Sequence, residues 1–273
     1  MEIYKKGDIY ECQFTYSGDN WEQYVFLLSD VHQDAKDCDR AMLKRDLEYA
    51  KRLGAEIFVG GDYVDCMGGK YDPRTHKGDL RPEYEVPNYY DVVEDEAVKS
   101  LEGYNIRYMG KGNHEENILH RHEIDLTARI AKRVGAVVGS YSDFIRFSFY
   151  NEAGSSKRHK DLYRDHSSGG ASPVTRDVIG TARRAAIYDA DIVWTEHTHT
   201  KWAVPLRRER VDKMGSIRYY TQMHVKTGTY NEKPTINRKQ WDSKFGPPSM
   251  GGVMLRFSVE GQRQSLKVEA TVS

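Results

Sequence analysis

The chain runs Tyr24-Val25-Phe26-Leu27-Leu28 and, after Ser29, continues as Asp30-Val31-His32. A continuous apolar run of this kind is typical of a strand that is buried on both faces. The run is followed by a carboxylate and an imidazole, which are side chains that bind divalent metals. This stretch therefore predicts a buried strand with candidate metal ligands at its carboxyl end.

The same arrangement recurs four more times along the chain. The later apolar runs are followed by the clusters Gly61-Asp62-Tyr63-Val64-Asp65, Gly112-Asn113-His114-Glu115, Asp165-His166 and His197-Thr198-His199. In an open α/β sheet the carboxyl ends of the strands meet at one edge and form the binding site. An accidental set of polar turns is the alternative interpretation, and five clusters in order favour a common site.

The chemistry of these clusters points to metal ions. They supply three carboxylates, one amide and five histidines, namely Asp30, Asp62, Asp65, Asn113, His32, His114, His166, His197 and His199. Oxygen and imidazole ligands together suit Mn²⁺, Zn²⁺ and Fe²⁺. The set is large enough for two adjacent ions, which is a device for attacking a phosphorus centre.

The periodicity of apolar residues predicts an α/β protein. In the first half we expect helices and strands to alternate, with helices at about 39–53, 88–101 and 115–134 and strands at 56–59 and 105–109. In the second half we expect mainly antiparallel strands and one helix at 174–188. A four-layer α/β/β/α sandwich, in which two mixed β-sheets are flanked by helices, accommodates both halves.

The length favours one domain over residues 1–273. We expect residues 1–23 to form a peripheral N-terminal segment. Residues 200–273 would supply the C-terminal strands and loops that complete the sandwich. We see no internal repeat and no linker.

The composition indicates a soluble globular protein. The formal net charge is +0, so no global field attracts nucleic acid or an anionic membrane. Cys12, Cys38 and Cys66 are odd in number and widely spaced, which favours reduced thiols over a disulfide framework. Neither a signal peptide nor a membrane-spanning run is visible, so we expect a cytoplasmic location and no membrane partner. The sequence leaves the oligomeric state open.

The five clusters resemble the calcineurin-like metallophosphoesterase superfamily, whose pattern is D-x-H, G-D-x-x-D, G-N-H-(D/E), H and G-H-x-H. The resemblance covers Asp30 to His199 and implies a pair of β-sheets flanked by helices. It also implies two divalent ions, with Mn²⁺ first and Zn²⁺, Fe²⁺ or Ni²⁺ as alternatives. The implied ligands are Asp30, His32 and His199 for the first ion, Asn113, His166 and His197 for the second, and Asp62 as the bridge.

The resemblance further implies a mechanism for phosphate esters. A hydroxide held between the ions would be the nucleophile. His114 would protonate the leaving group, and Asp65 would orient the His114 imidazole and stabilise its protonated form. Asn113 would contact the substrate as well as the metal.

Three features depart from one or another branch of this family. Glu196 precedes His197 where the family has glycine, and its side chain could line the cleft or point outward. Cys66 follows Asp65 where the protein phosphatases have a phosphate-gripping arginine. The complete pair of His197 and His199 resembles the phosphodiesterase and nuclease branches. The segments at 166–170 and 226–230 resemble phage-encoded members.

We therefore expect a phosphodiesterase or nuclease whose substrate is a nucleic acid or a nucleotide. A phosphomonoesterase such as a protein phosphatase is the alternative enzyme, and a non-catalytic scaffold is the alternative of another class. In the long loop at 68–88, Arg74, Lys77 and Arg81 could replace the missing arginine and bind the substrate. An ordinary charged loop is the competing interpretation.

Overall fold

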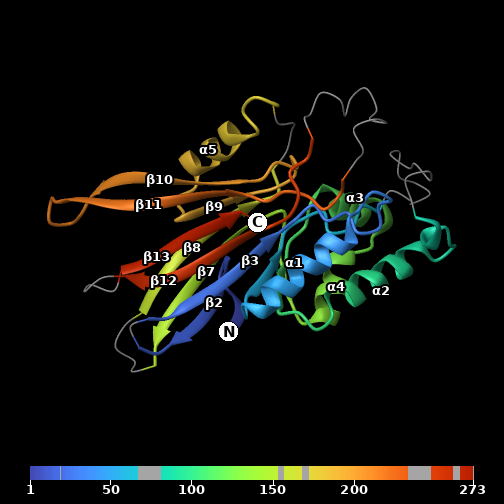
Figure 1. Cartoon of the computed structure of the whole chain (residues 1–273), viewed down its shortest axis with the longest axis horizontal. Helices are drawn as coiled ribbons and strands as arrows, with labels where there is room; N and C mark the ends of the chain where they lie inside the picture. The colour runs from blue at the N-terminus through green and yellow to red at the C-terminus, as the bar shows by residue number, and fades with distance from the viewer. Residues whose placement is uncertain are drawn as a thin grey trace.

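The computed structural model describes residues 1–18, 20–66, 81–152, 157–167, 172–232, 247–260 and 265–272. Within these ranges the chain forms two β-sheets that stack face to face (Figure 1). Four α-helices cover the outer side of one sheet and a single α-helix covers the other, again counting only the described ranges. The predicted four-layer α/β/β/α sandwich of two mixed sheets is confirmed.

The six-stranded sheet has the order β13-β12-β3-β4-β5-β6. Its strands are β3 (Glu22–Leu28), β4 (Glu56–Val59), β5 (Ile106–Met109), β6 (Val137–Val138), β12 (Val253–Glu260) and β13 (Ser265–Val272). β3 to β6 are parallel, and β12 runs antiparallel to both β3 and β13. The parallel pairing brings the loops after β3, β4 and β5 to one edge.

The seven-stranded sheet has the order β1-β2-β7-β8-β9-β11-β10. Its strands are β1 (Glu2–Lys6), β2 (Ile9–Tyr16), β7 (Ser142–Asn151), β8 (Lys157–Asp165), β9 (Ile192–Thr195), β10 (Trp202–Val211) and β11 (Ile217–Lys226). The antiparallel pairing expected in the second half of the chain is seen for β7 with β8, β10 with β11 and β12 with β13, whereas β9 pairs in parallel with both β8 and β11, and β7 pairs in parallel with β2. A helical crossover joins β8 to β9, and such a crossover places consecutive strands in parallel.

The helices are α1 (Arg40–Arg52), α2 (Tyr89–Leu101), α3 (Asn113–His122), α4 (Leu126–Val134) and α5 (Val178–Ile187), with a 3₁₀ turn, η2, at Pro82–Tyr84. The expected single helix at 115–134 was wrong. Glu123 adopts a left-handed conformation that ends α3, and the Asp125 side chain then accepts a hydrogen bond from the Ala128 amide to cap α4. α5 begins four residues later than expected, after Arg176 and Asp177, which both have positive φ.

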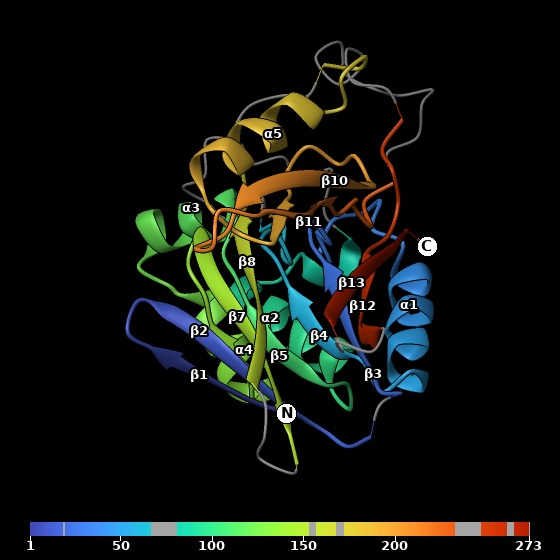
Figure 2. The same ribbon diagram turned by 90° about the vertical axis from the view of Figure 1, so that its left-hand side faces the viewer.

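Three apolar layers hold the sandwich together. On β3, Phe26 and Leu28 face the layer that contains α1 to α4, whereas Val25 and Leu27 face the other sheet. A smaller cluster lies between α5 and the seven-stranded sheet, and Figure 2 shows the two sheets between their helices. Cys12 on β2 is buried between the sheets. β2 therefore belongs to the core, although residues 1–23 were expected to be peripheral.

The three cysteines are free and buried, which fits the expected absence of a disulfide framework. Within the described ranges, no helix combines the length and the apolar character needed to cross a membrane.

Candidate metal centre

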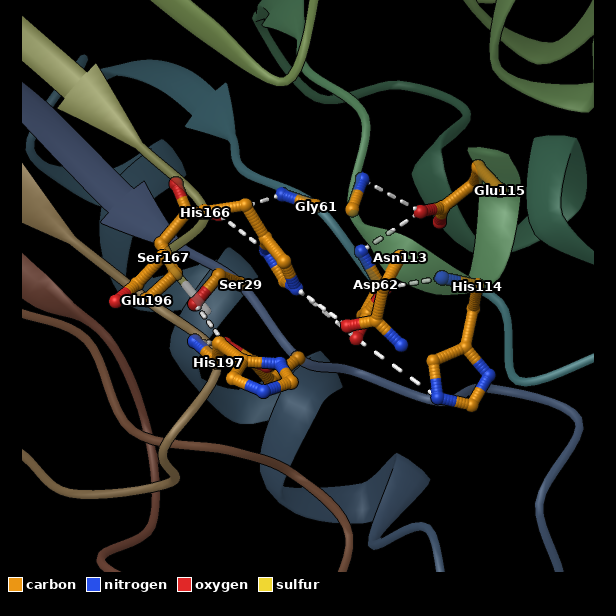
Figure 3. Close-up of polar contacts among 12 residues, drawn as sticks. Ser29, Gly61, Asp62, Asn113, His114, Glu115, His166, Ser167, Glu196 and His197 are labelled. Carbon is orange, nitrogen blue, oxygen red and sulfur yellow. Dashed lines mark hydrogen bonds and ion pairs between the residues drawn. The ribbon is translucent and has the colours of Figure 1, made fainter. Parts of the chain in front are cut away.

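Side chains from five loops meet at the carboxyl edge of the sandwich (Figure 3). Three groups of potential ligands form there among the described residues, and within each group the ligand atoms lie within 4.8 Å of one another; one of the three joins His32 to Asp65 and His114. We call the group of Asp30, His32 and His199 the outer subsite. We call the group of Asp62, His166 and His197, together with the neighbouring Asn113, the inner subsite.

The inner subsite gathers lone pairs around one point. His166 Nε2 lies 3.1 Å from Asp62 Oδ2 and 3.1 Å from Asn113 Oδ1 (Figure 3). His166 Nδ1 lies 2.9 Å from the Glu196 carboxylate, which is an acceptor, so the hydrogen bond assigns the ring proton to Nδ1. Nε2 is then the ring atom that faces the two oxygen acceptors, and with a cation bound between them it would be the lone pair offered to that cation.

The outer subsite repeats this pattern. His32 Nδ1 lies 2.8 Å from Asp65 Oδ1, while His32 Nε2 lies 3.3 Å from His199 Nε2. Asp30 Oδ1 is buried 3.5 Å from His199 Nε2, and it accepts no hydrogen bond from the described part of the chain. A buried carboxylate oxygen without a donor is costly. The residues of this subsite therefore also fit a divalent cation.

Burial and charge act in opposite directions on the two supported histidines. Burial lowers the pKa of His166, but Asp62 and Glu196 outweigh it and raise that pKa well above its ordinary value. Burial also lowers the pKa of His32, but Asp65, Asp62 and Asp30 outweigh it and raise the pKa to about 9. Both imidazoles thus sit in strongly anionic surroundings that favour positive charge.

The backbone at the ligands is unusual. Asp30, His32, Asp62, His197 and His199 have φ between 49° and 77°, which is the left-handed region. Such a conformation costs about 1–3 kcal/mol per residue and persists where the surrounding structure enforces it. The backbone turns sharply at these residues, after the ends of their strands, and no sequence pattern predicted the turns.

Two buried carboxylates hold the loop after β4 in this shape. Glu115 accepts hydrogen bonds from the backbone amides of Asp62, Tyr63 and Gly112 at 2.8–2.9 Å. Asp34 accepts hydrogen bonds from the amides of Asp65 and Cys66 at 2.6 and 2.8 Å. Sequence reasoning assigned neither role, although the acid that follows Asn-His in the third motif was a signal for Glu115.

Glu196 points inward and is fully buried, which decides between the two orientations left open by the sequence. It forms two ion-pair contacts with the Arg164 guanidinium, at 2.7 and 2.8 Å. Burial alone would raise the pKa of Glu196, but the charge of Arg164 and the hydrogen bonds from Arg164 and His166 lower it. Sequence reasoning missed Arg164, and its only signal was a cation in the strand segment that precedes His166.

His114 and Asp65 lie together, but not through the expected contact. His114 Nδ1 lies 2.6 Å from the backbone carbonyl of Asp65 and 3.5 Å from its carboxylate. The carboxylate lies closer to His32. His114 Nε2 lies 3.9 Å from Asp62 Oδ2 and is the ring nitrogen that faces the inner subsite. The carbonyl of Asp65 therefore orients His114, and its carboxylate mainly supports His32.

Of the three predicted substrate-binding cations, Arg81 lies in the described part of the chain. Arg81 donates hydrogen bonds to the carbonyls of Ala35 and Cys38 at 3.1 and 2.6 Å, which argues against the predicted phosphate contact. Its guanidinium stabilises the loop after the outer subsite instead. Arg74 and Lys77 lie outside the described residues.

The five motifs that resemble the calcineurin-like superfamily thus converge at one edge of a two-sheet sandwich. This architecture is consistent with the calcineurin-like sandwich that the motifs imply. No family model and no curated protein matches the chain.

Several solved structures are similar to this chain at low identity. A predicted phosphoesterase from Streptococcus pneumoniae TIGR4 is 14% identical with a TM-score of 0.32, over 92% of this chain and 99% of that chain. Vps29 complexed with Zn²⁺ from Entamoeba histolytica is 11% identical with a TM-score of 0.37, over 91% and 98%. A metallophosphoesterase from Sphaerobacter thermophilus is 14% identical with a TM-score of 0.34, over 92% and 89%. Because these values are low, function is inferred from the side-chain geometry.

Proposed function

We propose that this chain is a phosphoesterase that depends on two divalent metal ions and prefers phosphodiesters. The observation that carries the proposal is the convergence of His166 Nε2, Asp62 Oδ2 and Asn113 Oδ1 within 3.1 Å contacts, beside a second group with an unsatisfied carboxylate oxygen on Asp30. Acceptors gathered around one point in this way favour a cation between them.

Asp30, His32 and His199 would hold one ion, Asn113, His166 and His197 would hold the other, and Asp62 would contact both. Bound there, the ions supply Lewis acidity, which polarises a phosphate ester and lowers the pKa of water. The mixture of carboxylate, amide and imidazole ligands favours Mn²⁺, with Zn²⁺, Fe²⁺ and Ni²⁺ as alternatives.

His114 is the proposed proton donor to the leaving group. Because its Nδ1 proton is held by the Asp65 carbonyl, Nε2 is the atom left to carry the transferred proton. The side chain is 14% exposed, so a substrate at the edge of the sandwich could reach it. The Asn113 amide nitrogen is available to a phosphate oxygen, since its Oδ1 faces His166.

The charge around the site favours diesters over monoesters. A phosphomonoester carries about two negative charges near neutral pH, so its binding calls for more positive charge than a diester does. Cys66 occupies the position of the missing arginine and is buried. The nearby cations Arg164 and Lys226 are buried and paired with Glu196 and Asp177, respectively. A nucleic acid or a nucleotide is the proposed source of the diester.

A comparison of two aryl substrates tests this proposal. We expect kcat/KM for bis(p-nitrophenyl) phosphate to exceed that for p-nitrophenyl phosphate, which has the same leaving group. The assay is run on metal-free protein reloaded with Mn²⁺, Zn²⁺, Ni²⁺ or Mg²⁺ in turn. A clear monoester preference contradicts the diester assignment. Binding of two ions without turnover on either substrate supports the scaffold alternative instead.

A further inference from the structure

Arg164 and Glu196 form an ion pair that lies directly beneath the inner subsite. Both side chains are 0% exposed. Arg164 belongs to β8, and Glu196 follows the last residue of β9, so both come from the seven-stranded sheet. Burying such a pair is costly unless further hydrogen bonds satisfy it. Its remaining contacts therefore indicate what the pair is for.

The contacts of Arg164 cross to the other sheet. Its guanidinium donates to the carbonyl of Ser140 at 2.6 Å and to that of Lys111 at 3.0 Å. These residues lie in the loops that follow β6 and β5 of the six-stranded sheet. Arg164 thus links the two sheets at the edge where the metal ligands meet.

The contacts of Glu196 end at a metal ligand. Glu196 Oε2 accepts hydrogen bonds from the Gly61 amide at 2.8 Å, from Arg164 Nη2 at 2.8 Å and from His166 Nδ1 at 2.9 Å. One oxygen therefore joins the loop after β4, the guanidinium and the imidazole. Figure 3 shows His166 between Glu196 on one side and Asp62 with Asn113 on the other.

Two glycines make room for this pair. A Cβ atom at Gly60 would overlap the Glu196 carboxylate, and one at Gly110 would overlap the Arg164 guanidinium. Any side chain at either position would displace the pair. Glycine at the ends of β4 and β5 thus leaves the space that the Glu196 and Arg164 side chains of the opposite sheet occupy.

We propose that the Arg164–Glu196 pair is a positioning element that fixes His166 in one tautomer and orientation. The pair thereby supports metal binding at the inner subsite and not at the outer subsite. This inference rests on the proposed metal-dependent function. Glu196 accepts the Nδ1 proton, so Nε2 is the ring atom that faces Asp62 and Asn113 and is left for a metal ion. Arg164 holds the carboxylate in place and neutralises its charge.

The outer subsite has a separate support. There Asp65 accepts the Nδ1 proton of His32 at 2.8 Å, and among the described residues Asp65 forms no hydrogen bond or ion pair with Glu196 or Arg164. Each subsite therefore has its own carboxylate–histidine pair. Such carboxylates change metal affinity about 10–100-fold when they are removed. Loss of one supporting carboxylate should therefore lower the affinity for one ion and leave the affinity for the other unchanged.

Glu196→Gln tests this selectivity, with Asp65→Asn as the matched variant at the other subsite. Metal-free proteins are titrated with Mn²⁺ by calorimetry, and bound ions are counted after dialysis. We expect two ions on the wild type, and in each variant one ion of wild-type affinity and one weakened about 10–100-fold. The double variant should bind both ions weakly, because the two changes affect different subsites.

A spectroscopic readout separates positioning from general destabilisation. In protein saturated with diamagnetic Zn²⁺ and carrying ¹⁵N-labelled histidine, His166 should show a protonated Nδ1 and an Nε2 without a proton in the wild type. We expect Glu196→Gln to abolish that signature and to leave the corresponding signature of His32 unchanged. A variant that is merely less stable would keep both signatures below its unfolding temperature.

The outcomes distinguish this inference from the proposed function. A wild type that binds no ion overturns the proposed function. A wild type that binds two ions, together with a folded Glu196→Gln protein of unchanged affinities and tautomers, overturns only the positioning role. If Glu196→Gln fails to fold, the double variant Arg164→Met/Glu196→Gln leaves no unpaired buried charge and must meet the same expectations.

Discussion

The inner and outer subsites use similar ligands, but they differ in how those ligands are held. His166 of the inner subsite is fully buried, and its supporting Glu196 is locked by Arg164. His199 of the outer subsite is 32% exposed, and Asp65 is 14% exposed and lies near both His32 and His114. Each subsite contains one partly exposed histidine, His197 or His199, so the difference lies in the supports: the inner carboxylate is paired with a buried guanidinium, whereas the outer one is shared between His32 and His114.

The largest expected effect is the loss of metal from both subsites at once. Asp62 is the one ligand proposed to contact both ions, so Asp62→Asn should empty both and abolish turnover. Loss of a single electrostatic group in an active site already costs about 10²–10³-fold. Metal analysis and the diester assay measure the result. A variant with unchanged metal stoichiometry and full activity would refute the assignment of Asp62.

A smaller effect should leave both subsites filled. His114→Ala removes the proposed proton donor and should lower the rate on diesters with poor leaving groups by about 10²–10⁴-fold. Activated aryl leaving groups should lose less, because they depart without protonation. Metal content should equal that of the wild type. Equal losses on both classes of leaving group would count against the donor role.

The smallest expected effect on metal binding and turnover comes from replacing a carboxylate that lies far from the site. Glu11 on β2 is buried; burial raises its pKa, but hydrogen bonds from Lys6, Ser148 and Lys157 outweigh it and lower the pKa to about 2. Its folded-state pKa is below the usual 4.5, so its stabilisation is present above that pH and is lost as the pH falls toward 2.

Glu11→Gln should therefore lower the free energy of unfolding by about 1–3 kcal/mol at pH 7, an amount reduced by the solvent exposure of both lysines. Urea denaturation at pH 7 and pH 3 measures the change, which should shrink at the lower pH. Metal affinity and kcat/KM should stay at wild-type values. A change in either would show that the two supports at the site are not as independent of the rest of the fold as their contacts indicate.

The sequence predicted those parts of the fold that depend on local pattern. The apolar run ending at Leu28 predicted a buried strand, and β3 places Val25 and Phe26 on opposite apolar layers. The sequence also predicted which loops would converge, because the candidate ligands follow the carboxyl ends of the predicted strands. The break between α3 and α4 was missed, since a left-handed Glu123 carries no strong sequence signal.

The remaining parts depend on contacts between distant segments. Glu196 could be assigned no orientation from the sequence, because its partner Arg164 lies 32 positions away on another strand. Asp65 was assigned to His114 by resemblance, yet its carboxylate lies nearer to His32 than to His114. Side-chain pairing of this kind is set by tertiary geometry, which residue order alone does not specify.

The left-handed backbone at the ligands has a consequence for how substitutions at the site are chosen. Asparagine and glycine tolerate positive φ, whereas β-branched residues rarely do. Replacing Asp30 or Asp62 with asparagine therefore changes the ligand and spares the turn, but replacing either with valine would also distort the loop. A mutant library at these positions should be read in two classes, those that keep the turn and those that cannot, before any loss of activity is attributed to chemistry.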